Sequence, residues 1–65
     1  MNKPLTNAVV QLTGIDGNAF VIIGRVSAHI KRSDKPELVE QFIDDAQAGD
    51  YDNMLQVCMK YVTVE

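Results

Sequence analysis

His29 and Cys58 are the residues of this 65-residue chain whose chemistry could support nucleophilic catalysis, and each is the single residue of its type. A catalytic thiol needs a base within hydrogen-bond reach and a third group that orients this base. The expected helices place Cys58 on an apolar stripe and His29 on the polar side of another helix. The sequence therefore predicts a buried thiol, an exposed imidazole, no catalytic residue and no enzyme activity.

Carboxylates crowd residues 37–52, where no basic side chain is present. The acidic residues of this segment are Glu37, Glu40, Asp44, Asp45, Asp50 and Asp52. Such a cluster could bind a cation, dock on a basic protein or mimic a phosphate backbone. The run at residues 50–53 lacks the glycine and the distal glutamate of a calcium loop. We therefore expect a solvent-exposed acidic face and no metal site.

Gly14 and Gly17 are separated by two residues. This spacing matches neither the Rossmann fingerprint nor a P-loop, both of which hold phosphate groups. A turn explains the two glycines, so we expect no cofactor.

Cations gather immediately before the acidic segment. Arg25, His29 and Arg32 recur at i, i+4 and i+7, so they share one face of a helix, and Lys31 and Lys35 lie near its end. This basic stripe could bind phosphates or an acidic partner. The sequence favours a different role, in which these cations complement the helix dipole and face the acidic segment of the same chain. The net charge of −3 makes nucleic acid the weaker expectation.

The length of the chain corresponds to one domain with a marginal core. A single cysteine cannot form an internal disulfide, which suits a reducing compartment. The first residues lack the apolar core of a signal peptide, and no apolar run approaches the roughly 18 residues that span a bilayer. We expect a cytoplasmic protein with a flexible lead at residues 1–7, a single domain at residues 8–65 and no membrane partner.

A half-buried strand is expected at residues 8–13, where Ala8, Val10 and Leu12 would share the buried face. Residues 61–65 are also rich in β-branched side chains. They predict a short C-terminal strand or tail that pairs with the first strand.

Residues 14–26 admit two structures. In the first, residues 14–18 form the turn of a hairpin, and the Val and Ile residues that follow return as a strand. In the second, Asn18 or Asp16 caps a helix. The expected inner face of this helix consists of Phe20, Ile23, Val26, Ser27 and Ile30. The helical spacing continues to Ile30, and a strand would have Gly24 in its interior, so the sequence favours the helix.

Two further helices follow. Asp34 as cap, Pro36 in the first turn and Glu37 three positions after the cap are typical of a helix start. Gly49 is placed to end this helix in the left-handed conformation, and Asp50 to cap a third helix. The apolar stripes are Leu38, Val39, Phe42, Ile43 and Ala46, then Tyr51, Met54, Leu55, Cys58 and Val62. The predicted fold class is α+β, a single small domain with an N-terminal strand, three helices and a short C-terminal strand or tail that pairs with the first.

The chain contains three short motifs: GxDGNAF at residues 14–20, GRV at residues 24–26 and AGDYD at residues 48–52. The combination resembles a group of short bacterial and mobile-element proteins with no assigned activity. The resemblance covers roughly residues 9–65. It implies a strand, a long helix, two shorter helices and a short tail, and it implies no functional residue.

Val21, Ile22 and Ile23 follow one another on the first expected helix, which is therefore apolar around more of its circumference than one small core covers. Val21 and Ile22, with Met59 of the third helix, then predict an exposed apolar patch. We expect a small non-catalytic protein-interaction or regulatory module with an unknown protein partner, which could self-associate as a homodimer through this patch. The alternative is a nucleic-acid-associated regulator that uses the basic stripe Arg25, His29, Arg32 and Lys35.

Overall fold

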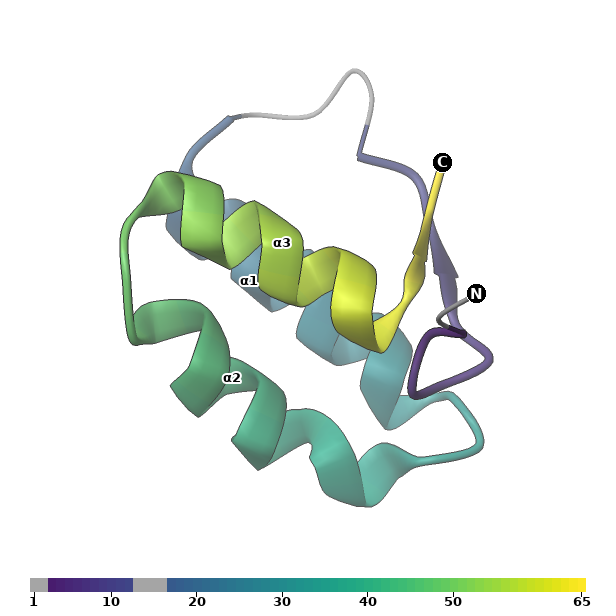
Figure 1. The fold of residues 1–65 in the computed structure, drawn as a ribbon. Helices are drawn as coiled ribbons and strands as arrows, with labels where there is room; N and C mark the ends of the chain where they lie inside the picture. Colours follow the sequence, from purple (N-terminus) through teal and green to yellow (C-terminus); the bar gives the residue numbers. More distant parts are fainter. Residues whose placement is uncertain (1–2, 13–16) are drawn as a thin grey trace.

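Three helices are closed on one side by a short two-stranded sheet (Figure 1). The computed structural model describes residues 3–12 and 17–65. In chain order the elements are β1 (Val9–Val10), α1 (Ala19–Lys31), the 3-10 helix η1 (Pro36–Leu38), α2 (Val39–Gln47), α3 (Tyr51–Tyr61) and β2 (Thr63–Val64). The predicted α+β architecture, with a strand at each end and three helices between them, is confirmed.

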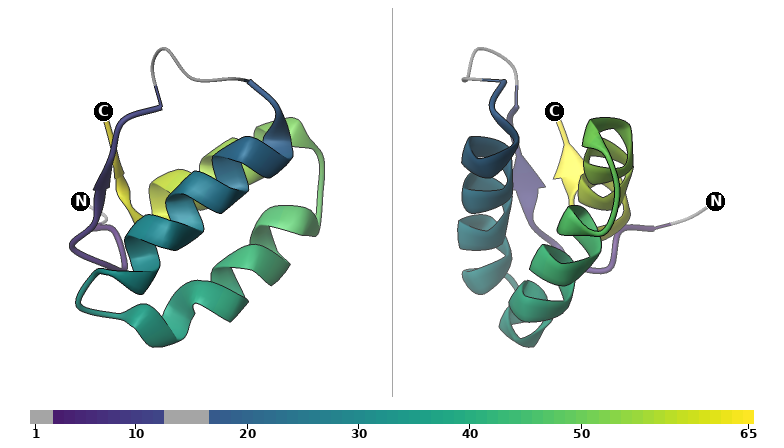
Figure 2. Two further views of the ribbon diagram at one scale, coloured as in Figure 1. Left: turned by 180° about the vertical axis from the view of Figure 1, so that it is seen from behind. Right: turned by 90° about the vertical axis from the view of Figure 1, so that its left-hand side faces the viewer.

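The two strands run parallel, with Val9 opposite Thr63 and Val10 opposite Val64. The Thr63 amide donates a hydrogen bond to the Ala8 carbonyl at 3.0 Å. Val10 is fully buried and Val9 is half exposed, as the alternation predicts. Parallel strands need a long crossover, which the three helices supply, so that β1 packs on α1 and β2 on α3 (Figure 2). The predicted pairing of the chain ends is confirmed.

α1 begins after Asn18, whose side chain accepts a hydrogen bond from the Phe20 amide at 2.8 Å. This cap satisfies one of the amides that a helix start leaves without a partner. The helical prediction is confirmed for residues 19–31, and the hairpin is wrong. Residues 13–16, which hold Asp16 and Gly14, lie outside the described residues.

The set of residues that α1 turns toward the core differs from the predicted set, because the helix is rotated about its axis relative to the prediction. The buried residues are Ile22, Ile23, Val26 and Ile30. Phe20, expected in the core, is 75% exposed, whereas Ile22, expected in a surface patch, is only 4% exposed. Residues 20–23 are all apolar, so their own pattern does not show which of them faces the core.

Asn7 and Asp34 join the N-terminal segment to the turn after α1. The amide of each donates a hydrogen bond to the side-chain oxygen of the other, at 3.0 and 3.1 Å. The prediction that Asp34 caps the second helix is therefore wrong, and η1 starts after Lys35 without a side-chain cap. Pro36 does occupy the first turn, as predicted.

Contacts with the domain begin before Ala8, the residue at which the sequence predicts that order starts. The Leu5 amide donates to the Lys60 carbonyl at 3.0 Å. The Thr6 hydroxyl, in a buried residue, donates to the Tyr61 carbonyl at 2.7 Å. Carbonyl groups at a helix end lack intrahelical partners, so the N-terminal segment completes the end of α3.

The turn between α2 and α3 is tight. Asp50 caps α3, as predicted, and its Oδ1 accepts a hydrogen bond from the Asn53 amide at 2.9 Å. The expectation of a left-handed Gly49 is wrong, because this residue lies outside the left-handed region of φ. A Cβ atom at Gly49 would come within 2.9 Å of the Asn53 side chain, so glycine is needed there for close approach.

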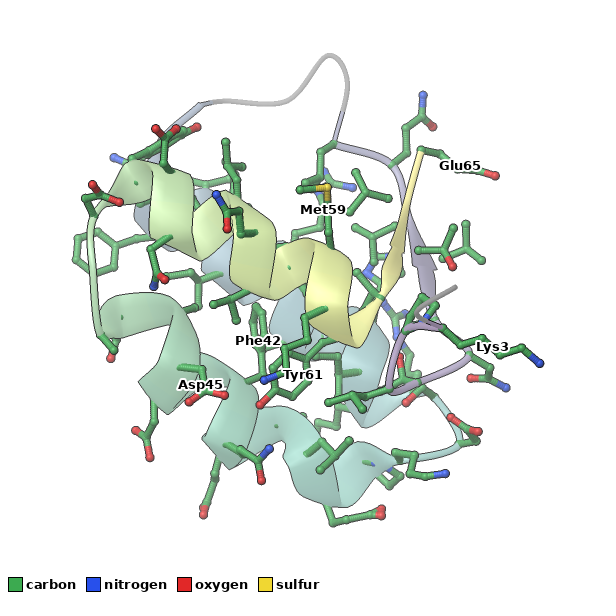
Figure 3. The ribbon with its side chains drawn as sticks, viewed as in Figure 1. Lys3, Phe42, Asp45, Met59, Tyr61 and Glu65 are labelled. Atoms are coloured by element: carbon green, nitrogen blue, oxygen red, sulfur yellow. The ribbon has the colours of Figure 1, made fainter. Side chains whose placement is uncertain are left out.

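Tyr61 lies at the centre of the core, where its ring packs edge to face on Phe42 with the ring centroids 5.3 Å apart (Figure 3). Its hydroxyl donates to Asp45 Oδ2 at 2.6 Å and accepts from Gln41 Nε2 at 2.9 Å. Among the described residues, every buried side-chain nitrogen or oxygen atom has a hydrogen-bond partner. The helices are therefore held by apolar packing together with the hydrogen bonds of the Tyr61 hydroxyl and the bond from Asn53 Nδ2 to the Asp45 carbonyl.

Candidate interaction surface

Cys58 and His29 lie on different helices, and no hydrogen bond joins them in the described structure. Cys58 is fully buried, and burial raises the pKa of its thiol to about 11. The thiol donates to Met54 Sδ at 3.7 Å. His29 is half-buried, and its Nδ1 lies 2.9 Å from the Arg25 carbonyl oxygen of its own helix. The predicted buried thiol is confirmed, and the imidazole is less exposed than expected.

The acidic segment contributes to the fold as well as to the surface. Asp45 is half-buried against Tyr61, and Asp50 caps α3, whereas the other four carboxylates of this segment are solvent-exposed. Within residues 3–12 and 17–65, no group of three or more His, Cys, Asp and Glu side chains has the geometry to hold a metal ion.

The predicted apolar patch of Val21, Ile22 and Met59 is not assembled. Ile22 belongs to the core, which corrects its assignment to the surface. Val21 is 43% exposed and Met59 is 56% exposed. Figure 3 shows the Met59 side chain on α3. The buried side of α1 packs against α3, and Val21 lies on the opposite side of α1. Val21 and Met59 therefore belong to different surfaces.

Two rows of residues at spacings i, i+4, i+7 and i+11 cover the side of α1 that faces away from the core. They are Phe20, Gly24, Ser27 and Lys31, and Val21, Arg25, Ala28 and Arg32. We call these eight residues the outer face of α1. The first residues of the two rows, Phe20 and Val21, are apolar. Arg25 lies at the middle of α1, and Lys31 and the cap residue Arg32 lie at its C-terminal end, so the face is apolar at its N-terminal end and basic from its middle onward.

The predicted basic stripe is only partly gathered on this face. Arg25 and Arg32 belong to it, and Arg32 Nε donates to the Ala28 carbonyl at 3.3 Å. Lys35 lies beyond the helix end, with its Nζ 4.0 Å from an Asp34 carboxylate oxygen. This is the one ion pair found between described residues. The sequence predicts that the stripe faces the acidic segment at residues 37–52. Among the described residues, no ion pair joins the stripe to this segment.

A groove of about 320 Å³ opens at the N-terminal end of α1, against the turn between α2 and α3. It is lined by Ala19, Phe20, Ile23, Ala46, Gln47, Gly49, Asp50, Tyr51 and Met54. The Tyr51 hydroxyl donates to the Gly17 carbonyl at 2.7 Å and so ties the start of α3 to the residue before the α1 cap. Phe20 lines the groove and also begins the outer face, so the two surfaces are continuous.

Neither a protein-family model, a curated protein nor a solved structure matches the chain. Among the residues that the structure describes, no helix has the length and apolar character needed to cross a bilayer. Phe20 and Ser27 are residues of the outer face that the sequence assigned to the inner face of this helix, and only the rotation of α1 reveals the exposure of Phe20.

Proposed function

We propose that the chain is a non-catalytic protein-interaction module that binds its partner through the outer face of α1 and the adjoining groove. The observation that carries this proposal is the position of Phe20, which is 75% exposed at the rim of a largely apolar groove. Binding of a partner that removes the surface of an exposed phenylalanine from water lowers the free energy of the complex.

The composition of α1 supports the same proposal. A helix on the surface of a globular protein normally carries charged side chains opposite its apolar stripe. Residues 17–24 carry no charged side chain, although Phe20, Val21 and Gly24 are exposed on the side opposite the core. A helix that is apolar on two sides is typical of a helix that is covered on two sides.

Selection of ligands tests this proposal. Random 16-residue peptides displayed on phage would be selected against the wild-type chain and then measured on Phe20→Ser and on the control Met59→Ser. We expect the selected peptides to lose at least about tenfold in affinity on Phe20→Ser, because truncation of a central aromatic contact has this size of effect. The control removes an exposed apolar side chain from α3 and should leave affinity unchanged. Failure to select any peptide, or equal loss on both variants, would refute the proposal.

A nucleic-acid-associated regulator is the second candidate, because Arg25 and Arg32 are exposed and form no ion pair with a described carboxylate. Duplex DNA would then bind in a salt-dependent manner, and the double variant Arg25→Ala/Arg32→Ala would lose this binding. The net charge of −3 and the apolar N-terminal end of the outer face favour a protein partner.

The buried single cysteine supports a reducing, cytoplasmic location, which we include in the proposal. A second copy of this chain would also qualify as the protein partner. Sedimentation equilibrium of the wild type over a range of protein concentrations would detect such a homodimer, and dissociation by Phe20→Ser would assign it to this surface.

A further inference from the structure

We infer that the partner is an acidic protein segment, with an apolar side chain that enters the groove and Asp or Glu side chains that pair with the basic end of α1. This inference rests on the proposed function and adds the chemistry of the partner. It follows from the order of residues along the outer face, which begins with the apolar Phe20 and Val21 and carries its cations from Arg25 onward.

The apolar end of the surface is built to receive one bulky side chain. The groove has a floor of buried Ile23 and Met54 and a rim of exposed Phe20 and Tyr51, with the polar Gln47 and Asp50 at the turn between α2 and α3. The Tyr51 bond to the Gly17 carbonyl holds this rim in place without a partner. A preformed apolar groove costs little conformational entropy on binding, so an aromatic or aliphatic side chain is the ligand that suits it.

The cations of the surface follow Phe20 along the axis of α1, with Arg25 about 8 Å away and Lys31 and Arg32 at the C-terminal end of the helix. From Phe20 to Lys31 the axial distance is about 17 Å, at about 1.5 Å per residue. Lys31 lines a hollow together with Glu37 and Glu40, although no ion pair joins it to a described carboxylate. Arg25 and Arg32 lie on the other row, away from this hollow, and they carry the complementarity to an acidic partner.

A symmetric dimer through this face fits the charges less well. If two α1 helices met in parallel, Arg25 and Arg32 of one copy would face the same arginines of the other. If they met antiparallel, the basic end of each would cover the apolar end of its partner. Neither arrangement pairs opposite charges, whereas an acidic segment does so while its apolar side chain fills the groove.

The peptides selected on the wild-type chain test the inference through their charge. We expect an excess of Asp and Glu over Lys and Arg, together with at least one large apolar residue. Arg25→Glu should weaken these peptides by about fivefold or more, because charge reversal turns a surface ion pair into a repulsion. The matched control Lys60→Glu makes the same change of net charge at an exposed position on α3 and should change affinity less than about twofold.

The failures of the two proposals are distinguishable. Peptides that depend on Phe20 but carry no acidic excess, or that bind Arg25→Glu and Lys60→Glu equally, would overturn the acidic partner and leave the interaction module standing. The absence of any Phe20-dependent peptide would overturn both. A homodimer that Phe20→Ser dissociates, or duplex DNA that competes with the selected peptides and outbinds them at 0.15 M salt, would also overturn the acidic protein segment.

Discussion

The Tyr61 hydroxyl donates a hydrogen bond to the Asp45 carboxylate over 2.6 Å and thereby joins the end of α3 to α2 inside the core. The same hydroxyl accepts a hydrogen bond from Gln41 at 2.9 Å. The Asn53 side chain donates a further hydrogen bond to the Asp45 carbonyl at 3.4 Å, so the polar contacts between α2 and α3 centre on Asp45 and Tyr61. Removing the Tyr61 hydroxyl tests how much of the stability depends on its two hydrogen bonds.

Tyr61→Phe should keep the ring contact with Phe42 and lose both hydrogen bonds of the hydroxyl. It leaves the Asp45 carboxylate without this partner, so we expect the free energy of unfolding to fall by about 1–2 kcal/mol. Urea denaturation followed by circular dichroism measures this change. Tyr51→Phe, which removes a surface hydrogen bond, is the control and should lower the free energy of unfolding clearly less. An equal decrease would show that the Tyr61–Asp45 bond stabilises the fold no more than a surface hydrogen bond does.

High pH should destabilise the fold through Cys58 and Tyr61. Burial raises the pKa of the Cys58 thiol from 9.0 to about 11, and burial followed by the bond to Asp45 raises the pKa of Tyr61 above 10.0. The folded chain therefore holds these protons more tightly than the unfolded chain. The stabilisation is complete below about pH 9 and is lost as the pH rises through 11.

The thiol part of this loss is on the order of 2–3 kcal/mol, and urea denaturation between pH 7 and 11 measures it. Cys58→Ala should lower stability at pH 7 by its cavity but flatten the decline between pH 9 and 11. An unchanged decline in Cys58→Ala would assign the alkaline effect to other groups.

The reciprocal hydrogen bonds between Asn7 and Asp34 should couple the N-terminal segment to the turn after α1. We expect Asn7→Ala and Asp34→Ala each to cost about 1 kcal/mol, and the double variant to cost less than the sum. Hydrogen exchange of the Thr6 and Ala8 amides should accelerate in both single variants. Asp44→Ala, at an exposed position on α2, is the control, and additive costs would show that the two residues act independently.

Gly24 and Gly49 should respond in opposite ways to alanine. A Cβ atom at Gly24 would meet nothing within 4 Å, so Gly24→Ala should stabilise α1 by about 0.5–1 kcal/mol. A Cβ atom at Gly49 would lie 2.9 Å from the Asn53 side chain, so Gly49→Ala should destabilise the turn before α3. Thermal unfolding of the two variants side by side measures both signs. A Gly24→Ala variant that is no more stable than the wild type would contradict the free space seen there.

Local signals in the sequence were sufficient for the order of the elements. Asn18 and Asp50 cap the helices that follow them, as expected, because a side-chain oxygen satisfies amides only a few residues away. The alternation of Ala8 and Val10 likewise predicted the buried side of β1. Each of these features is decided within one turn or one strand.

Features that join distant segments could not be predicted in this way. The sequence assigned Asp34 to a cap, but the structure uses it to bind Asn7, 27 residues away. It placed Phe20 in the core and Ile22 on the surface, and the structure reverses them. Both errors have the same origin. The neighbouring residues allow more than one hydrogen-bond partner for Asp34 and more than one buried side for α1, and contacts with distant segments determine which is formed.

The sequence by itself determined the order of the three α-helices between two strands, the cap of α3, the burial of Cys58 and the pairing of the two chain ends. Only the tertiary structure decided the rotation of α1 and hence its outer face. A run of four apolar residues has no preferred side until α2, α3 and β1 pack against it, and that packing leaves Phe20 beside the groove. The local sequence therefore predicts the helices that carry the candidate interaction surface, whereas tertiary packing determines which of their residues are exposed on it.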